Sequence, residues 1–393
     1  MFPHFLPLNR FAVATLFSIT SFSITIPNAR AQPVNMPSDI QTLLEQRLPE
    51  IREAADQFGN AGIVMHKGQI IAQSQSGVRQ KGKQDKIQST DKWHIGSITK
   101  SMTASMIGRL VDKNQLDFDA TIAELLPNQK SQIDIAWYPV KLIELLQHTS
   151  GAKGNFNIPT MLNNSFADET ALLQAREKAV LGALSKPPQN APNTTFAYSN
   201  LGYTIAAYIA EQATNKSWET LVQEELFAPL QLSSAGFGAP KGEQPWGHAT
   251  RFFLFTSAAD PQSPGSDNTP IIGPAGTVHM SIRDLAHYGQ MHLDALNGST
   301  SFMSATTERR LHTPSELTKH NERYAAGWII IPPRTPLDGE VLFHNGSNTM
   351  WYAFLIVEPK HDIVAAFTTN TGTIEESEAQ FGALFQDLLL KME

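Results

Sequence analysis

A serine and a lysine lie three residues apart in the stretch WHIGSITKSM, which runs from Trp93 to Met102. Positions i and i+3 of a helix share one face, so the Ser97 hydroxyl and the Lys100 amine can meet without help from another segment. A serine becomes a strong nucleophile only when a base takes its proton. A lysine can be that base when burial lowers its pKa and leaves it neutral. The pattern therefore predicts a nucleophile with its base, and the alternative is an N-cap serine followed by a solvated lysine.

The residues around this pair favour the chemical interpretation. A helix that begins at Ser97 would aim its free N–H groups and positive dipole end at a developing oxyanion, and the N–H of Ser97 would be one donor. A second Ser-x-x-Lys match, residues 89–92, lies in a polar stretch without apolar periodicity, so we interpret it as solvated surface. After Ser97, by contrast, apolar residues recur every four positions, at Ile98, Met102, Met106 and Leu110.

Two further elements carry groups that suit the same chemistry. In YSN, the Tyr198 phenol can relay a proton and the Asn200 amide can hold a substrate carbonyl. In HNGS, His344–Ser347, the edge of a predicted strand can donate a backbone N–H to an oxyanion and pair with an extended substrate. Each has a plainer explanation, because Tyr198 can be a loop aromatic on the core and Asn-Gly is a strong turn signal. The order of the three elements along the chain favours the catalytic interpretation.

The elements that must position these residues divide the chain into strands at both ends and helices in the middle. A helix from Ser38 and two strands within 61–77 precede the motif, and four β-rich runs and a last helix near Thr373 end the chain. We expect one antiparallel sheet assembled from both termini and faced by the terminal helices. This sheet lobe takes about 38–95 and 300–393, and a mostly helical lobe takes about 96–299. The Pro-, Gly- and Ser-rich stretch 241–276 is predicted as a long loop.

Composition excludes several classes of protein. The 393 residues carry a formal charge of -7, which gives no basic footprint for nucleic acid. The chain has no cysteine, so disulfides and thiol catalysis are excluded. Residues 1–31 contain Arg10, an apolar run and the ending Ala29-Arg30-Ala31, which predicts a signal peptide cut after Ala31 and a periplasmic or secreted domain, 32–393. An uncleaved N-terminal membrane anchor is the alternative for this leader, and we expect no other membrane span.

We predict neither a metal site nor a cofactor. His279, His287 and His292 are close in sequence, but the latter two lie five apart on a predicted helix, which puts them on different faces. We interpret them as solvated or internally satisfied histidines rather than zinc ligands. The chain has no Gly-x-Ser-x-Gly elbow and no Walker or Rossmann fingerprint.

Taken together, the motifs resemble the serine β-lactamase and penicillin-binding-protein superfamily, in its class C β-lactamase, DD-carboxypeptidase and esterase branch. The resemblance extends over roughly 40–390 and implies an α+β, β-lactamase/transpeptidase-like fold with an acyl-enzyme mechanism. It rests on HIGSITK (94–100), LLQHTSG (145–151), YSNLGY (198–203), GPAGTVHMSIRDLA (273–286) and HNG (344–346).

The resemblance also implies a role for each site residue. Ser97 resembles the acylated nucleophile, Lys100 its base, and Tyr198 the partner base and proton relay. Asn200 would steady Lys100 and the substrate. The remaining substrate-binding and oxyanion candidates form the HNGS element, in which His344 stands where many members have lysine and Ser347 would lend the second oxyanion N–H: His344, Asn345, Gly346 and Ser347.

The chain departs from the β-lactamases proper at this third element. They usually carry Lys-Thr-Gly, whereas Asn345 here replaces the threonine that helps bind a substrate carboxylate, and a neutral His344 supplies less positive field than lysine. We therefore expect a peptidase or esterase that acts on a small molecule or peptide, with weak or no β-lactamase activity. The alternatives are a catalytically silent penicillin- or peptide-binding sensor and a true class C-like β-lactamase.

Overall fold

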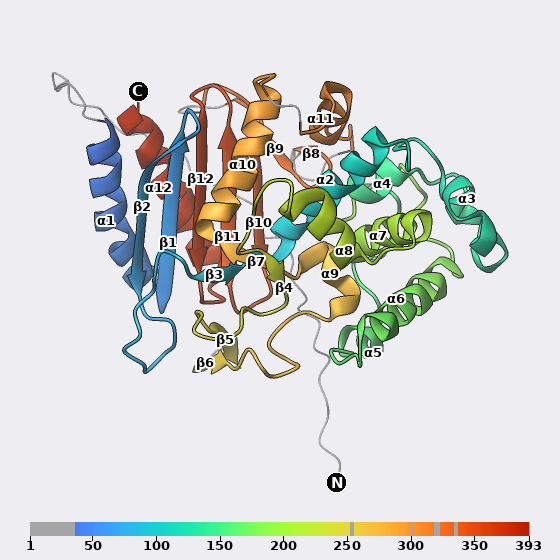
Figure 1. Cartoon of the computed structure of the whole chain (residues 1–393), viewed down its shortest axis with the longest axis horizontal. Coiled ribbons are helices and arrows are strands. Elements are labelled where there is room, and N and C mark those ends of the chain that lie inside the picture. Colours follow the sequence, from blue (N-terminus) through green and yellow to red (C-terminus); the bar gives the residue numbers. More distant parts are fainter. Residues whose placement is uncertain (1–35, 252–254, 300–301, 318–322, 334–336, 393) are drawn as a thin grey trace, which may run out of the picture.

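Strands from both ends of the chain form the main antiparallel sheet. The computed structural model describes residues 36–251, 255–299, 302–317, 323–333 and 337–392, so the predicted leader, residues 1–31, lies outside the described residues. The strands of this sheet are β1 Gly59–His66, β2 Gln69–Gly77, β8 Arg323–Tyr324, β9 Ile329–Ile331, β10 Val341–Ser347, β11 Tyr352–Glu358 and β12 Ile363–Thr369. Their order is β2-β1-β12-β11-β10-β9-β8 (Figure 1).

The pairing of β1 with β12 joins the strands from the two ends of the chain into one sheet. Asn60 lies opposite Thr369, and His66 lies opposite Ile363. The β1–β2 hairpin turns at Lys67 and Gly68, whose φ angles of +50° and +74° are those of a two-residue hairpin turn with left-handed residues. The predicted sheet and hairpin are both confirmed.

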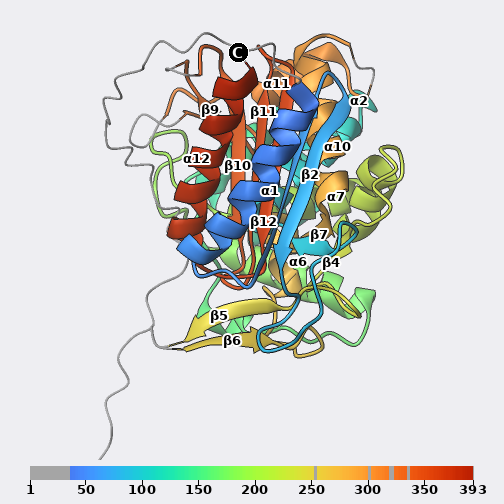
Figure 2. The same cartoon turned by 90° about the vertical axis from the view of Figure 1, so that its left-hand side faces the viewer.

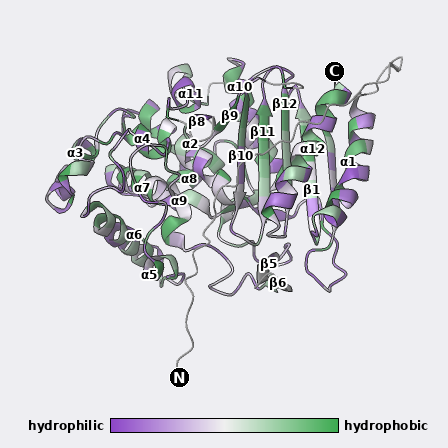
Figure 3. Ribbon diagram, turned by 180° about the vertical axis from the view of Figure 1, so that it is seen from behind, coloured by the Kyte–Doolittle hydropathy of each residue, from purple (hydrophilic) through white to green (hydrophobic). Residues whose placement is uncertain are grey.

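Two terminal helices, α1 Met36–Ala54 and α12 Ile374–Met392, cover one face of the sheet (Figure 2). Apolar residues recur along α1 every three or four positions and are buried against the strands. In Figure 3 the central strands are coloured as hydrophobic, whereas α1 and α12 carry both colours. The core on this face includes Leu44, Leu48, Phe343, Phe354, Phe367, Phe381 and Leu384.

Helix α10, Ile282–Leu296, packs on the opposite face of the sheet against β1, β11 and β12 (Figure 1). A Cβ at Gly289 would lie 2.6 Å from Val364 Cγ1, so this glycine lets the helix approach β12 closely. The predicted lobe boundary near residue 300 assigns this helix to the helical lobe, although the helix packs on the sheet. The apolar face of this helix could pack on the sheet or on other helices, and periodicity alone does not decide between the two.

The remaining helices lie beside the sheet on the side of β8, β9 and β10 (Figure 1). At their centre is α2, which is buried along nearly its whole length and follows directly on the turn that holds Ser97. Among the described residues, no helix is long and apolar enough to cross a bilayer. The bounds are α2 Thr99–Asp112, α3 Ile122–Leu125, α4 Leu142–Leu146, α5 Ile158–Met161, α6 Glu169–Leu184, α7 Asn200–Thr214, α8 Trp218–Val222, α9 Gly273–Gly276 and α11 Ala305–His312.

Two small sheets complete the fold. One has the order β3-β7-β4, with β3 Lys92–His94, β4 Gly236–Phe237 and β7 Val278–Ser281. The other is a pair, β5 Gly247–Arg251 and β6 Phe255–Ala259, inside the stretch that we predicted as loop. The prediction missed this pair because tertiary contacts hold it: the His248 amide donates to Met350 O at 3.0 Å, and its ring nitrogen Nδ1 lies 2.7 Å from Asn370 O.

Candidate active site

The turn that carries Ser97 is pressed against strand β10. Ser97 lies in a single 3-10 turn, Gly96–Ile98, between β3 and α2, and Gly96 has a φ of +51°. A Cβ on Gly96 would lie 2.2 Å from the amide nitrogen of Ser347, and one on Gly346 would lie 2.4 Å from the amide nitrogen of Ser97. The two glycines therefore let both backbones approach each other. The N–H groups of Ser97 and Ser347 lie close together as a result, and such a pair suits a developing oxyanion.

Lys100 is fully buried one helical turn after Ser97. Its Nζ atom lies 3.1 Å from Ser97 Oγ, 2.7 Å from Asn200 Oδ1 and 2.8 Å from Ala275 O. The amide and carbonyl oxygens can only accept, so they take both protons of a neutral amine and leave its lone pair for the Ser97 hydroxyl proton. Burial also lowers the pKa of Lys100 well below its usual value. The contacts and the burial both suit Lys100 as a base.

The Tyr198 phenol lies beside the same two groups. Its ring centroid is 4.6 Å from Lys100 Nζ, and the Ser97 side chain is near enough to its hydroxyl to affect the pKa of the phenol. Tyr198 is half-buried as a residue, and desolvation raises the pKa of its phenol by more than the nearby Ser97 side chain lowers it. A neutral phenol accepts a proton only as it gives its own away. The arrangement therefore suits a relay better than a standing phenolate base.

The segment Tyr198–Asn200 is held in place from two sides. Ser199 caps α7, because its Oγ accepts from the Gly202 amide at 2.8 Å, and its own amide donates to His148 Nδ1 at 3.1 Å. The His148 ring lies 4.3 Å from the Tyr198 ring, centroid to centroid. Burial lowers the pKa of His148 well below its usual value, so the ring is neutral and can accept from Ser199. Sequence reasoning gave His148 only a helix-ending role and missed that it positions this segment.

His344 is buried on the side of β10 that faces the helices. Its Nδ1 lies 2.5 Å from Asn345 O, and its Nε2 lies 3.0 Å from the Tyr324 hydroxyl. Burial lowers the pKa of His344 to about 3. The imidazole is therefore neutral at neutral pH, and it adds no positive charge at the position where many relatives have lysine. Tyr324 was not among the predicted site residues, and no motif pointed to it.

Asn345 does not join the other predicted site residues. Its Nδ2 donates to Glu378 of α12, on the opposite face of the sheet, because successive side chains of a strand alternate between faces. The Ser347 hydroxyl is also occupied, since it donates to Trp351 O at 2.6 Å and accepts from the Thr349 amide at 2.8 Å. The structure thus corrects the prediction for Asn345, whose side chain stabilises the sheet–helix contact. For Ser347, the backbone N–H is the group that remains available at the site.

A series of buried polar contacts holds the turn of Ser97 in place. His94 Nδ1 accepts from the Gly96 amide at 3.1 Å, and His94 Nε2 lies 2.8 Å from Asp267 Oδ1. Asp267 in turn accepts from Asn348 Nδ2 at 3.0 Å. These contacts link the turn of Ser97, the segment before α9 and the end of β10. Sequence reasoning missed Asp267 and Asn348, which lie in loops and follow no periodic pattern.

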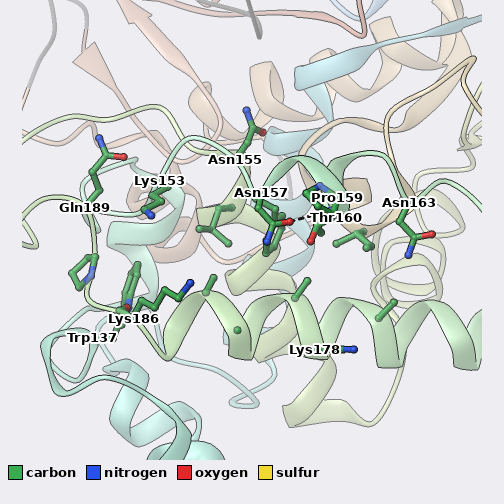
Figure 4. A pocket seen from close by; sticks show the side chains of 18 of the residues that line it. Trp137, Lys153, Asn155, Asn157, Pro159, Thr160, Asn163, Lys178, Lys186 and Gln189 are labelled. Carbon is green, nitrogen blue, oxygen red and sulfur yellow. Dashed lines mark hydrogen bonds between the residues drawn. The ribbon is translucent and has the colours of Figure 1, made fainter. Parts of the chain in front are cut away.

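A cavity of about 530 Å³, whose lining side chains are drawn in Figure 4, extends to Leu201 at the start of α7. Asn155 lines this cavity, and its Oδ1 accepts from Asn200 Nδ2 at 2.7 Å. Three lysines, Lys153, Lys178 and Lys186, also line it. Ser97 does not, so the cavity can receive only a part of a ligand that lies remote from the reacting bond.

The geometry agrees with the comparisons to known proteins. The sequence profile of the family described as Beta-lactamase matches residues 44–386. The chain belongs to this family. Its members are serine hydrolases, and penicillin-binding protein 4 of Amycolatopsis lactamdurans is 28% identical to this β-lactamase-family chain over 326 residues, which are 80% of each protein. The predicted family resemblance is confirmed.

Two solved structures share the fold of this β-lactamase-family chain. A class C β-lactamase superposes with a TM-score of 0.74 at 16% identity, over 93% of this chain and 99% of that one. A D-stereospecific amidohydrolase from Streptomyces sp. superposes with a TM-score of 0.68 at 19% identity, over 88% of this chain and 98% of that one. The predicted α+β fold is confirmed.

Proposed function

We propose that the protein is an exported serine hydrolase that cleaves an amide or ester through an acyl-enzyme on Ser97. One observation carries this proposal: the contacts of Lys100 Nζ. Two acceptor-only oxygens, Asn200 Oδ1 and Ala275 O, hold the amine at 2.7 and 2.8 Å, and Ser97 Oγ lies 3.1 Å away at its remaining position. A solvated lysine next to an N-cap serine would have no such set of partners.

In the first step, the Ser97 proton passes to the neutral amine of Lys100 while Oγ attacks the carbonyl carbon. The C=O electron pair moves onto the oxygen, and the N–H groups of Ser97 and Ser347 stabilise the resulting oxyanion. Collapse of the tetrahedral intermediate reforms the C=O bond and breaks the bond to the leaving amine or alkoxide. Tyr198 donates its hydroxyl proton to that leaving group and regains one from Lys100, so the proton from Ser97 ends on the leaving group.

In the second step, water attacks the ester carbonyl of the acyl-enzyme. Its proton passes through Tyr198 and Lys100 back to Ser97 Oγ, which leaves as the restored hydroxyl. The site thus begins and ends with a neutral lysine and a neutral phenol. The lowered pKa of Lys100 and the raised pKa of Tyr198 both favour those neutral forms.

For the substrate class, we infer a D-amino-acid peptide or amide, or a simple ester, rather than a β-lactam. Penicillins and peptides that end in free D-alanine both carry a carboxylate, and neutral His344 gives such a group no positive partner at β10. Asn345 is directed towards Glu378 and is equally unable to bind it. An ester, an amide or a peptide cleaved at its amino end therefore fits the site better than either of these carboxylates. The shared fold with a D-stereospecific amidohydrolase adds support for an amide substrate. We also propose that residues 1–31 direct export to the periplasm or beyond.

A substrate panel tests the proposal. The chain without residues 1–31 is assayed with D-alanyl peptides, a D-amino-acid p-nitroanilide, p-nitrophenyl acetate and nitrocefin, in parallel with Ser97→Ala. We expect Ser97-dependent turnover of a peptide, amide or ester and slow turnover of nitrocefin. Rapid nitrocefin hydrolysis would establish a β-lactamase instead. No turnover together with no fluorophosphonate labelling of Ser97 would establish a silent binding module.

A further inference from the structure

A second cluster of chemically active side chains lies where α2, α10 and α11 meet. It consists of His292 from α10 with Glu308 and His312 from α11. One nitrogen or carboxylate oxygen from each residue lies within 4.8 Å of the other two. His292 Nδ1 and His312 Nε2 are only 2.9 Å apart. Residues 308 and 312 are one turn apart and so share a face of α11, which brings three potential ligands to one point.

Glu308 is the unexplained member of this cluster. Only 4% of the residue is exposed, and neither carboxylate oxygen has a hydrogen-bond partner within the described part of the chain. A buried carboxylate without a partner is costly, and buried charges in native proteins are nearly always paired or bound to a metal. A bound cation would give these two oxygens the partner that the described residues do not supply.

All three side chains can bind a divalent metal, the histidines through a ring nitrogen and the glutamate through a carboxylate oxygen. A divalent cation between the three groups would favour the ionised carboxylate and replace the missing partner.

We propose that His292, Glu308 and His312 bind one Zn²⁺ ion. Two imidazole nitrogens and one carboxylate oxygen form a common zinc ligand set, and a water molecule would complete the tetrahedron. With His292 bound through Nδ1, its Nε2–H faces Ser105 Oγ at 3.4 Å, which is the outer hydrogen bond that fixes a ligating histidine. His312 is partly exposed and gives the ion a route from solvent.

The ion would stabilise the packing of the helices and would take no part in the reaction at Ser97. Ser105 lies on α2, the helix that begins beside Ser97 and contains Lys100. Zinc would join α10 to α11 and press both against this helix. The expectation of no metal site came from histidines near one another in sequence, whereas two of the ligands proposed here come from α11.

Metal binding by the untagged chain tests the proposal without any enzyme assay. The protein is stripped with a chelator, dialysed against ZnCl₂ and analysed for bound metal, and Co²⁺ replaces Zn²⁺ in a parallel sample to give a visible absorption spectrum. We expect one ion per chain, a tetrahedral cobalt spectrum and a rise of a few degrees in Tm on zinc addition. Glu308→Gln and His312→Ala are expected to weaken binding by more than about 10-fold.

The controls make every outcome decisive. His287→Ala changes an exposed histidine of the same helix and should bind zinc like the parent. Glu308→Gln removes a buried charge at constant size, so it should fold without metal and lose the zinc-induced rise in Tm. A parent chain that binds no zinc at micromolar concentration would refute the proposal. Equal zinc affinity in the parent chain and in Glu308→Gln would refute it as well.

Discussion

The two faces of strand β10 differ in what their residues do. On one face, His344 and Gly346 lie against the turn of Ser97, and a Cβ at position 346 would lie 2.1 Å from Ile95 O. On the other face, Phe343 packs in the apolar core under α1 and α12, and Asn345 donates to Glu378. One face shapes the site where an acyl group would react, and the other stabilises the sheet.

The comparison teaches that a contiguous motif can hold two kinds of residue. The element HNGS is four consecutive residues, yet the alternation of a strand divides its side chains between a reactive face and a structural face. Substitutions on the reactive face should therefore change mainly the rate. Substitutions on the structural face should do the reverse.

The largest effect on the rate is expected for the nucleophile Ser97, which lies against the reactive face. Ser97→Ala removes the nucleophile and should lower kcat/KM by on the order of 10³-fold or more, because the remaining oxyanion donors cannot replace covalent attack. Steady-state kinetics with the best substrate of the panel measure this loss. Ser89→Ala, in the second Ser-x-x-Lys match, is the matched control and should keep the parent rate. Equal losses in the two variants would show that Ser97 has no special role.

Removal of the base is expected to have the next largest effect. Lys100→Ala should lower kcat by about 10²- to 10⁴-fold, the usual contribution of a general base. Lys100→Arg should be equally impaired, because a guanidinium stays protonated and cannot take the Ser97 proton. Burst kinetics that separate acylation from deacylation provide the measurement. An arginine variant with the parent acylation rate would mean that only the positive charge matters.

Gly346→Ala tests the close approach on the reactive face. The new Cβ would lie 2.1 Å from Ile95 O and 2.4 Å from the Ser97 amide nitrogen, so the two backbones must separate. Displacing an oxyanion donor costs about 10²- to 10³-fold in kcat, and we expect a loss in that range. Gly265→Ala is the control, because a Cβ there meets nothing within 4 Å. Unchanged kcat in Gly346→Ala would exclude the Ser347 amide as a donor.

Asn345→Ala should have the smallest effect on the rate. The side chain faces α12, so kcat/KM should stay within about twofold, as for a substitution remote from the site. Loss of its hydrogen bond to Glu378 should lower the free energy of unfolding by about 1 kcal/mol, which denaturant titration measures. A large loss of rate with an unchanged free energy of unfolding would show that Asn345 contacts the substrate, and would contradict the division between the two faces of β10.

The sequence predicted much of this arrangement because its signals are local. The Ser97–Lys100 spacing and the two strands within 61–77 depend only on nearby residues, and each lies where the pattern indicated. The approach of β10 to Gly96 was also implied, through the family resemblance. Such signals predict elements and their facing residues.

The remainder depends on contacts between distant segments. His148 reaches the Ser199 amide from 51 residues away, and the Asp267 carboxylate reaches His94 from an unrelated loop. No periodicity encodes these pairs. Asn345 was grouped with the substrate-binding candidates because the motif was interpreted as a unit, although strand geometry places its side chain on the face opposite His344.

The central claim is that a neutral Lys100 takes the proton of Ser97, and the pH dependence of Ser97 acylation tests it most directly. A base works only above its pKa, so labelling by a fluorophosphonate should slow as pH falls through the pKa of Lys100. Because burial lowers that pKa, we predict a plateau at neutral pH and an acidic limb well below about 10.4, the ordinary lysine value. Lys100→Ala should react slowly without this limb. Wild-type labelling that rises only near pH ~10, or an identical profile in Lys100→Ala, would contradict the account.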